Sequence, residues 1–372
     1  MKYCARCVTP DTRPNIRLDA QGVCNACRNF ESRAGIDWAG RARAFARVAD
    51  NARSASRGYD CLIPVSGGKD SFWQTLVCLE HGLKPLCVTW RPWARTPLGQ
   101  ANLRALVELG VDHVDYSISP DVERRFMLKA YERFGSTAVP MHMALFAIPL
   151  ALAARFSIPL VVWGENSAFE YGDASQRDTG FKLDAAWLAT YGVTHGTTAA
   201  DWLDQGFTRA ELTPYFGPSQ EELEAAGVLA VFLGYYFPWD PERSRRAALA
   251  HGFREREAGP RTGLYAYADI DDRFISLHHH LKWHKFGFTR LFDNLSLEIR
   301  HGRITRQQAV ETIARTGDQT PHQDIAHFCA FAGIGVERYH EIAEGFRNPA
   351  VWTRRDGAWR IEDFLIPDWR WT

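Results

Sequence analysis

Cys61-Leu62-Ile63-Pro64-Val65-Ser66-Gly67-Gly68-Lys69-Asp70-Ser71 joins an apolar run to a glycine turn, and a segment with helical spacing follows it. A strand, a glycine turn and a helix in this order present backbone N–H groups and a helix N-terminus to an anion. Lys69 adds a positive charge, and a carboxylate such as Asp70 is useful beside phosphate mainly where a divalent cation lies between them. The stretch therefore predicts a nucleotide phosphate site with Mg²⁺ near Asp70. The alternative interpretation is a glycine turn with polar neighbours and no ligand.

Residues 66–71 do not have the spacing of the P-loop of common NTPases, which is G-x-x-x-x-G-K-[ST]. They resemble instead the SGGxDS pattern of the PP-loop ATP pyrophosphatases. The resemblance implies an enzyme that binds ATP, adenylates a substrate oxygen and releases pyrophosphate. The ATP-binding residues that it implies are Ser66, Gly67, Gly68, Lys69, Asp70 and Ser71 at the phosphates and Val88, Thr89 and Trp90 at the adenine. For the last three, ordinary packing at the end of a strand is the alternative.

The composition limits the partners that the chain can have. Its 372 residues are enough for one large domain with additions or for two domains. Lys and Arg number 44, as do Asp and Glu, so no global field favours nucleic acid or an anionic membrane. No uninterrupted apolar run reaches the roughly 18 residues of a membrane span, and the first residues lack the apolar core of a signal peptide. We therefore expect a cytoplasmic protein without a nucleic-acid or membrane partner.

Two cysteine pairs stand near the N-terminus, Cys4 with Cys7 and Cys24 with Cys27. The spacing C-x2-C-x16-C-x2-C can place four thiolates around one zinc ion. The turn-rich segment between the pairs could not form a core by itself. Two disulfides are the alternative, which a cytosolic setting disfavours. We expect a structural zinc knuckle in residues 1–35, with no open coordination position for catalysis.

Apolar runs and helical patterns alternate after residue 60. The predicted strands are 61–65, 85–90, 111–116 and 158–163, and the predicted helices between them are 72–81, 100–110, 121–134 and 141–156. This alternation favours an α/β fold with a parallel sheet and helices on both faces. We expect it to be the PP-loop ATP pyrophosphatase (adenine nucleotide α-hydrolase-like) domain, residues 36–240. A mostly helical C-terminal region, residues 241–372, follows, and its aromatic tail 352–372 should pack back on the body.

Polar residues follow the fourth strand, where ligands of parallel sheets commonly bind. Gly164, Glu165 and Asn166 come first, and Glu170 and Tyr171 follow. A glycine and two carboxylates at this place suit a site for nucleotide, metal or substrate, and composition alone leaves the role open. We select Glu165 and Glu170 as catalytic candidates, Gly164 as an ATP contact, and Asn166 and Tyr171 as substrate contacts.

A second polar cluster lies in residues 278–290. Its three consecutive histidines are weak metal candidates, since neighbours in sequence on a helix point apart. An anion-binding face is the more credible interpretation. Its substrate-binding candidates are Lys282, His284, Lys285 and Arg290.

Several separate stretches resemble the bacterial N-acetyl sugar amidotransferases. These are the cysteine pairs, 65–71, 164–172, 232–236, 284–290 and 296–306. The resemblance runs nearly end to end, although Trp93, the Trp-rich region 187–202 and the triple histidine do not match a feature of the family. It implies synthesis of an acetamidino sugar for lipopolysaccharide O-antigen or flagellin glycans.

The reaction that the resemblance implies uses ATP, Mg²⁺ and a structural Zn²⁺. The acetamido oxygen of an N-acetyl sugar, which we expect to be nucleotide-linked, is adenylated, and ammonia then replaces it with release of AMP. The catalytic residues would be Lys69, Asp70, Glu165 and Glu170. Positioning and charge neutralisation by Lys69 and Mg²⁺ would assist the poorly nucleophilic amide oxygen.

The chain shows no glutaminase signature of its own. Position 2 is Lys rather than a nucleophilic Cys, and no G-x-C-x-G elbow surrounds Cys61, Cys78, Cys87 or Cys329. We therefore expect a separate glutamine amidotransferase partner that supplies ammonia. Whether the chain forms a homodimer is open.

Three other functions are compatible with a PP-loop. A tRNA-thiolating enzyme would combine such a domain with a zinc knuckle, but the cysteines after the loop form no C-x-x-C and the balanced charge disfavours a large RNA footprint. An amide- or nitrile-forming ligase acting on a small carboxylic acid is the second alternative. A nucleotide-binding scaffold without catalysis is the third.

Overall fold

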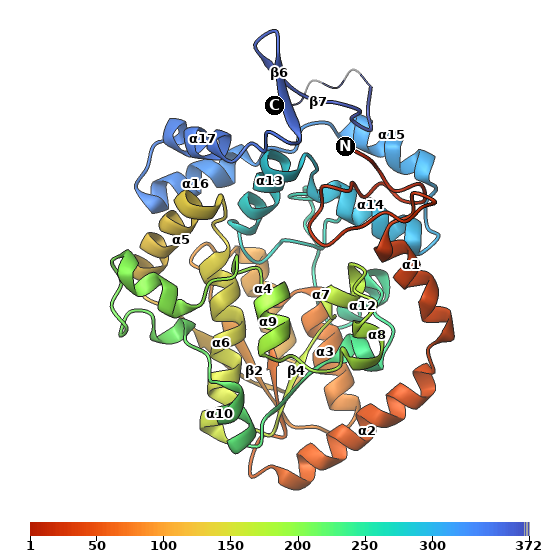
Figure 1. Cartoon of the computed structure of the whole chain (residues 1–372). Helices are drawn as coiled ribbons and strands as arrows, with labels where there is room; N and C mark the ends of the chain where they lie inside the picture. The colour runs from red at the N-terminus through yellow and green to blue at the C-terminus, as the bar shows by residue number, and fades with distance from the viewer. Residues whose placement is uncertain (368, 370, 372) are drawn as a thin grey trace.

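The computed structural model describes residues 1–367, 369 and 371. A five-stranded parallel sheet with the order β3-β2-β1-β4-β5 forms its centre (Figure 1). The strands are β1 (Cys61–Pro64), β2 (Pro85–Trp90), β3 (Asp112–Tyr116), β4 (Leu160–Trp163) and β5 (Leu229–Phe232). The strand order reverses between β1 and β4. Ligands of open α/β sheets bind at such a switch point, outside the carboxyl ends of the strands.

Helices cover both faces of the sheet because alternate side chains of each strand point to opposite faces. Cys61 and Ile63 belong to one apolar core with α2, α3, α4 and α12, whereas Leu62 belongs to a second core with α5, α6 and α9. The covering helices are α2 (Trp38–Ala55), α3 (Lys69–Glu80), α4 (Pro97–Val107), α5 (Pro120–Phe134), α6 (Val139–Phe156), α9 (Ala185–Tyr191) and α12 (Pro241–Leu249). Burial on both faces explains why the strands read as continuous apolar runs.

Short elements, together with α9, connect β4 to β5. They are α7 (Ser167–Glu170), α8 (Gln176–Thr179), η2 (Ala199–Gln205), η3 (Thr213–Tyr215) and α10 (Gln220–Ala225). β5 itself was not predicted, because it shares one apolar stretch with the single-turn helix α11 (Leu233–Tyr236). The other four strands and the helices between them confirm the predicted alternation to within a few residues at each end.

Helix α6 is long and apolar enough to cross a membrane, with a mean hydropathy of 1.5 over Val139–Phe156. More than half of it, 56%, is buried inside the protein, where it packs on β1, β2 and β4. A core helix of a soluble α/β protein passes the same test. The packing of α6 on the sheet therefore accounts for its apolar character.

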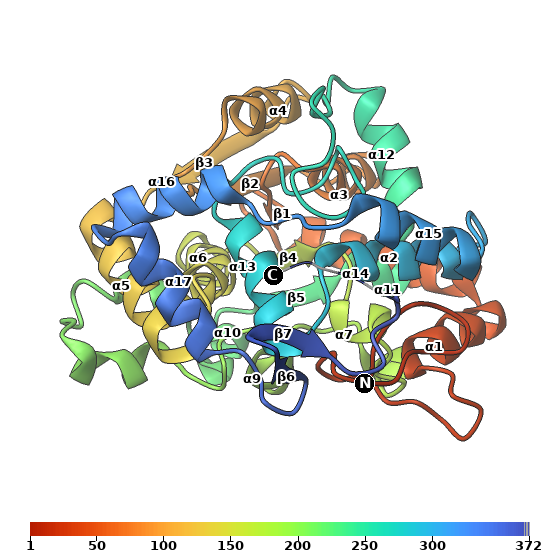
Figure 2. The same cartoon turned by 90° about the horizontal axis from the view of Figure 1, so that it is seen from above.

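The C-terminal region lies over the carboxyl edge of the sheet. Figure 1 shows α13 and α14 above the strands, and the view from above in Figure 2 shows the same helices across them. Its elements are α13 (Ile275–Phe286), α14 (Arg290–Arg300), α15 (Arg306–Thr316), α16 (His322–Ala332), α17 (Val336–Gly345), β6 (Trp352–Arg355) and β7 (Ala358–Ile361). The region is mainly helical, as predicted. The antiparallel hairpin β6–β7 was not predicted.

The aromatic tail packs on α13, as predicted for the residues that the structure describes. The ring of Trp283 lies 4.9 Å from that of Trp352 and 5.4 Å from that of Trp369. Residues 368, 370 and 372 of the predicted tail lie outside the described part of the chain. The predicted domain boundaries near residues 35 and 240 stay a prediction, although α12 packs on α3 and shares the core of the sheet.

Candidate active site

The glycine loop turns sharply between β1 and α3. Gly67 has a φ of +84°, and a Cβ atom on it would lie 2.7 Å from the backbone nitrogen of Leu103, so only glycine fits. The hydroxyls fix the turn: Ser66 N–H donates to Ser71 Oγ at 3.0 Å, and Gly68 N–H donates to Ser66 Oγ at 3.2 Å. Helix α3 begins directly after Gly68. The loop thus has the backbone geometry that an anion site requires.

The two charged residues of the loop contact each other. The Lys69 ammonium is ion-paired with the Asp70 carboxylate, and both belong to the first turn of α3. The indole N–H of Trp239 donates to Asp70 Oδ1 at 2.9 Å. The Lys69 ammonium also lies 5.5 Å and 5.8 Å from the ring centroids of Trp239 and Tyr267, within cation–π range. Asp70 therefore has partners on both oxygens.

A cavity of about 1280 Å³ opens at the carboxyl edge of the sheet. Its walls come from the glycine loop, the ends of β2 and β4, the segment 187–196, α6 and α13. The predicted site residues that line it are Ser66, Asp70, Ser71, Val88, Trp90, Gly164, Glu165, Tyr171, Lys282, Lys285 and Arg290. Those that do not line it are Gly67, Gly68, Lys69, Thr89, Asn166, Glu170 and His284. One cavity thus joins the glycine loop to the basic residues of α13, more than 200 residues apart in sequence.

Glu165 faces this cavity close to the glycine loop. The pKa of its carboxyl is raised to about 7, first by burial and then by the neighbouring Asp70 carboxylate, while Lys69 opposes the shift. A carboxylate with a pKa near neutrality can exchange protons with a reacting group at physiological pH. Glu165 is therefore suited to act as a general base.

Glu170 and Asn166 form the frame of the site and not its surface. The buried Glu170 is ion-paired with Arg33 of η1 (Arg33–Gly35). Asn166 caps α7 by accepting from Ala168 N–H at 3.0 Å, accepts from the Trp187 indole N–H at 3.0 Å and donates to the backbone carbonyl oxygen of residue 180 at 3.0 Å. Because these groups are satisfied within the protein, both side chains position the 164–172 loop. Neither Glu170, predicted to be catalytic, nor Asn166, predicted to contact substrate, lines the cavity.

The three predicted residues at the end of β2 also differ in whether they line the cavity. Val88 and Trp90 line the cavity, whereas the Thr89 hydroxyl is buried and donates to the Val65 carbonyl oxygen at 2.7 Å. The Thr89 side chain therefore ties the end of β2 to the residue after β1 and does not line the cavity.

Basic residues form the wall opposite the glycine loop. Burial lowers the pKa of both Lys282 and Lys285 to about 8. The buried Asp293 carboxylate lies 2.7 Å from Arg13 Nε, 3.4 Å from Lys282 Nζ and 3.9 Å from Arg290 Nη1. Burial alone would raise the pKa of Asp293, but these three cations hold it well below the usual range. Arg290 Nε also lies 4.0 Å from the carboxylate of Asp269. The four cations Arg13, Lys282, Lys285 and Arg290 outnumber these two paired carboxylates, so the wall suits an anionic group.

His284 lies on the far side of α13. Its Nε2 atom is 3.3 Å from a Glu344 carboxylate oxygen, and its backbone carbonyl accepts from the Trp352 indole N–H at 2.9 Å. The predicted substrate contact at this position is corrected: His284 joins α13 to α17 and the hairpin.

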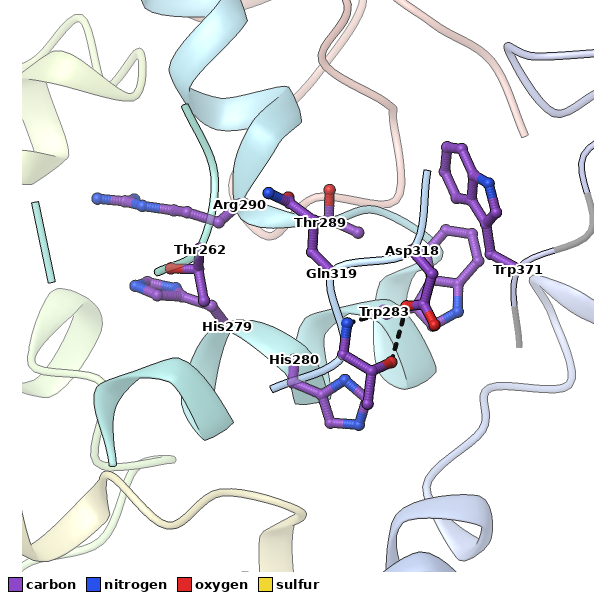
Figure 3. A pocket seen from close by; sticks show the side chains of 10 residues that line it. Thr262, His279, His280, Trp283, Thr289, Arg290, Asp318, Gln319 and Trp371 are labelled. Carbon is purple, nitrogen blue, oxygen red and sulfur yellow. Dashed lines mark hydrogen bonds between the residues drawn. The ribbon is translucent and has the colours of Figure 1, made fainter. Parts of the chain in front are cut away.

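A second, small cavity of about 20 Å³ lies behind the basic wall (Figure 3). His279 and Arg290 border both cavities. Among the described residues, His279 Nδ1 and Gln319 Oε1 have no hydrogen-bond partner at this place. The volume suffices for about one water molecule, which such polar atoms could bind.

Several cavity residues were not predicted. Arg13 reaches the cavity from the segment between the cysteine pairs, and its guanidinium stacks 3.8 Å above the ring of Tyr171. Asp269, Asp271 and Asp272 also line the cavity, on the loop before α13. The acidic residues stand in an aromatic and histidine-rich segment, which gave a weak signal. Arg13 gave none, because a single arginine in a turn-rich segment has no distinguishing pattern.

The four N-terminal cysteines form a candidate metal site. Their sulfur atoms lie within 4.8 Å of one another, all four thiols are buried, and none forms a disulfide. Backbone N–H groups point at the sulfurs, as Cys24 N–H does at Cys4 Sγ (3.2 Å). A tetrahedral zinc with Zn–S bonds of about 2.3 Å separates its sulfurs by about 3.8 Å, and Cys7 Sγ lies 3.7 Å from Cys24 Sγ. The residues therefore fit zinc.

The cysteine knuckle, residues 1–35, joins the two sides of the cavity. Thr9 Oγ1 donates to Ser296 Oγ of α14 at 2.9 Å, and Arg306 Nε donates to the Cys7 carbonyl oxygen at 3.1 Å. On the other side, Asn25 of α1 (Asn25–Ser32) donates to the carbonyl oxygen of residue 172 at 3.1 Å. The knuckle thus holds α14 and the 164–172 loop in fixed relation.

Comparisons with known proteins find one similar domain family and one similar solved structure. The model of a family described as LPS biosynthesis protein WbpG-like, C-terminal domain, matches residues 265–365. A solved structure of NMN synthetase from Francisella tularensis is similar with a TM-score of 0.35 and 13% identity, covering 83% of this chain and 96% of that chain. The search of curated proteins finds no match. The chain thus has an open α/β fold with an SGGxDS loop after β1, and its residues 265–365 are similar to a domain of lipopolysaccharide biosynthesis.

Proposed function

We propose that the protein is an ATP-dependent amidotransferase that converts the acetamido group of a nucleotide-linked N-acetyl sugar into an acetamidino group, with release of AMP and pyrophosphate. The observation that carries the proposal is the single cavity that joins the glycine loop to the basic wall. The similarity of residues 265–365, which hold that wall, to a lipopolysaccharide biosynthesis domain supports a sugar as the acceptor.

ATP would bind with its phosphates on the glycine loop and the N-terminus of α3. Lys69 would turn from Asp70 to the phosphates, and Val88 and Trp90 would border the base. Asp70 offers the carboxylate oxygen that Mg²⁺ prefers, and the ion would neutralise phosphate charge there. The acceptor would then bind at the basic wall. Lys282 and Lys285, with pKa values of about 8, are mostly charged at neutral pH and suit the phosphates of a nucleotide carrier.

The acetamido oxygen attacks the α-phosphorus of ATP, the bond from that phosphorus to the bridging oxygen breaks, and pyrophosphate leaves. Ammonia then adds to the imidate carbon and transfers a proton to the Glu165 carboxylate. The carbon–oxygen bond breaks and AMP carries away the former acetamido oxygen. Adenylation supplies the leaving group, and the burial that raises the pKa of Glu165 to about 7 matches that residue to the proton transfer.

We propose further that ammonia comes from a separate glutaminase. Among the cavity residues that the structure describes there is no cysteine, so neither a glutaminase nucleophile nor a sulfur-carrying thiol faces the glycine loop. Cys61, Cys78 and Cys87 are buried in the core of the sheet. This arrangement favours ammonia over sulfur as the nucleophile and disfavours the tRNA-thiolation alternative.

The test is pyrophosphate release by the purified chain with ATP, Mg²⁺ and ammonium and a panel of acceptors. The panel holds free and nucleotide-linked N-acetyl sugars, unmodified tRNA with a sulfide source, and small carboxylic acids. We expect release only with a nucleotide-linked N-acetyl sugar, and glutamine should not replace ammonium. Release with tRNA or with a carboxylic acid would support one of the alternatives and contradict the proposal.

A further inference from the structure

We propose that Trp239, which lies outside the glycine loop and outside the cavity lining, is a positioning residue that orients the Asp70 carboxylate for the cation of bound Mg²⁺·ATP. The inference rests on the proposed use of Asp70 in ATP binding. The inference goes beyond the proposed function because it assigns a role to a residue some 170 positions from Asp70 in the sequence.

The contact is specific in chemistry and geometry. Trp239 is only 8% exposed, and its indole N–H donates to Asp70 Oδ1 at 2.9 Å. A buried indole N–H needs an acceptor, and a hydrogen bond to a charged acceptor is stronger than one between neutral groups. The partner of Asp70 Oδ2 is Lys69. The two oxygens of Asp70 therefore have different partners, a neutral donor and a mobile cation.

This difference gives the two partners different roles when ATP binds. Lys69 has to leave Asp70 to reach a phosphate, and Oδ2 then becomes available to the metal ion. Trp239 stays, because its ring is packed in the core that contains Phe72 and Val77 of α3. It holds Oδ1 and thereby fixes the rotation of the carboxylate, so that Oδ2 is the oxygen that Lys69 would leave free. Without the indole N–H the carboxylate could rotate away from the cation.

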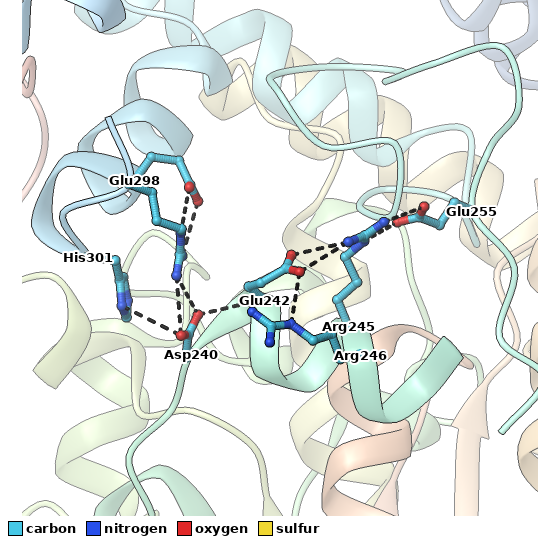
Figure 4. Close-up of polar contacts among 8 residues, drawn as sticks. Asp240, Glu242, Arg245, Arg246, Glu255, Glu298 and His301 are labelled. Atoms are coloured by element: carbon cyan, nitrogen blue, oxygen red, sulfur yellow. Dashed lines mark hydrogen bonds and ion pairs between the residues drawn. The ribbon is translucent and has the colours of Figure 1, made fainter. Parts of the chain in front are cut away.

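A network of ion pairs fixes the backbone next to Trp239 (Figure 4). Asp240 caps α12 by accepting from the Glu242 N–H at 3.0 Å, and Arg303 Nη1 donates to Asp240 Oδ1 at 3.0 Å. Arg303 Nε in turn lies 2.6 Å from Glu298 Oε2 of α14. The network links the first turn of α12 to the C-terminal region. The backbone on the C-terminal side of Trp239 is thus tied to α12 and α14.

The test compares nucleotide affinity with and without a divalent cation. Binding of ATP to the wild type, Trp239→Phe, Trp239→His and Trp202→Phe is measured by calorimetry in Mn²⁺ and again in EDTA. Trp239→Phe keeps an aromatic ring and loses the donor, whereas Trp239→His keeps a ring N–H. Trp202→Phe is the matched control, because the buried Trp202 indole donates to Thr197 at 3.1 Å and does not line the cavity.

We expect Trp239→Phe to weaken ATP binding in Mn²⁺ about tenfold, as the loss of one hydrogen bond to a charged group predicts, and to leave binding in EDTA unchanged. Trp239→His should recover most of the loss, and Trp202→Phe should show none. An equal loss in both buffers, a similar loss in Trp202→Phe, or no loss at all would overturn the role of Trp239. If Trp239→Phe does not fold, Trp239→Leu, which is also apolar and lacks a donor, makes the same comparison. Wild-type chain that binds no Mn²⁺·ATP would refute the proposed function as well, whereas failure of the variant alone would refute only this inference.

Discussion

Replacing Glu165 by Gln should remove the pH dependence of the amination step. In the wild type the carboxyl has a pKa raised to about 7, mainly by burial. Only the deprotonated carboxylate can accept a proton from the attacking ammonia, so activity is lost as the pH falls through the raised pKa. The kcat/KM for ammonia should therefore rise with pH.

The magnitude follows from the titration. With a pKa of about 7, the carboxylate fraction is roughly one tenth at pH 6 and roughly nine tenths at pH 8. We expect kcat/KM to rise about tenfold over this interval in the wild type. Glu165→Gln should be about 10²- to 10⁴-fold slower, which is the usual contribution of a general base, and its profile should be flat.

The assay is AMP release at saturating ATP and acceptor and subsaturating ammonia, so that the rate reports kcat/KM for ammonia, and total ammonium is adjusted so that free ammonia is equal at every pH. Glu170→Gln is the matched control, because this carboxylate belongs to the same loop but is paired with Arg33 away from the cavity. The Glu170→Gln control should keep the rise of kcat/KM near pH 7. A step that persists in Glu165→Gln, or a wild-type step near pH 4.5, would refute the reasoning.

Three further predictions concern the loop, the basic wall and the knuckle. Lys69→Ala should slow adenylation by about 10²-fold or more while circular dichroism stays unchanged, since the lysine supplies charge to the phosphates; near-normal pyrophosphate release would remove it from the site. Lys285→Ala should raise the KM for the acceptor about tenfold and leave the KM for ATP unchanged. His284→Ala should leave the KM for the acceptor unchanged and lower the thermal midpoint. The reverse pattern would contradict the placement of α13. Metal analysis should find one zinc per chain, and Cys24→Ser should lose it and lower the thermal midpoint, because zinc binding stabilises such knuckles; fully stable, zinc-free protein would contradict this assignment.

The fold was largely predictable because its signals are local. A pattern of about ten residues is enough to predict the glycine turn between an apolar strand and a helix. The spacing of the four cysteines is likewise enough to predict the knuckle. β5 was not predicted because one apolar run, residues 228–236, contains both a strand and a helical turn. An apolar run without alternation cannot reveal where the strand ends.

The site was predictable only in part, because it is assembled by tertiary contacts. His278, Lys282 and Lys285 lie at helical spacing and share the face of α13 that borders the cavity, whereas His284 falls on the opposite face. That division follows from the 3.6-residue period and could have been drawn from the sequence. The place of Arg13 could not, because it depends on an ion pair with Asp293, 280 residues away.

The fate of the acetamido oxygen tests the central claim most directly. The acceptor is prepared with oxygen-18 in its N-acetyl carbonyl and incubated with the chain, ATP, Mg²⁺ and ammonium, and the products are separated for mass spectrometry. The account predicts one labelled oxygen in the phosphate of AMP, none in pyrophosphate, and an acetamidino product without label. Label that stays in the sugar, or that leaves as water while AMP is unlabelled, would contradict adenylation of the acetamido oxygen.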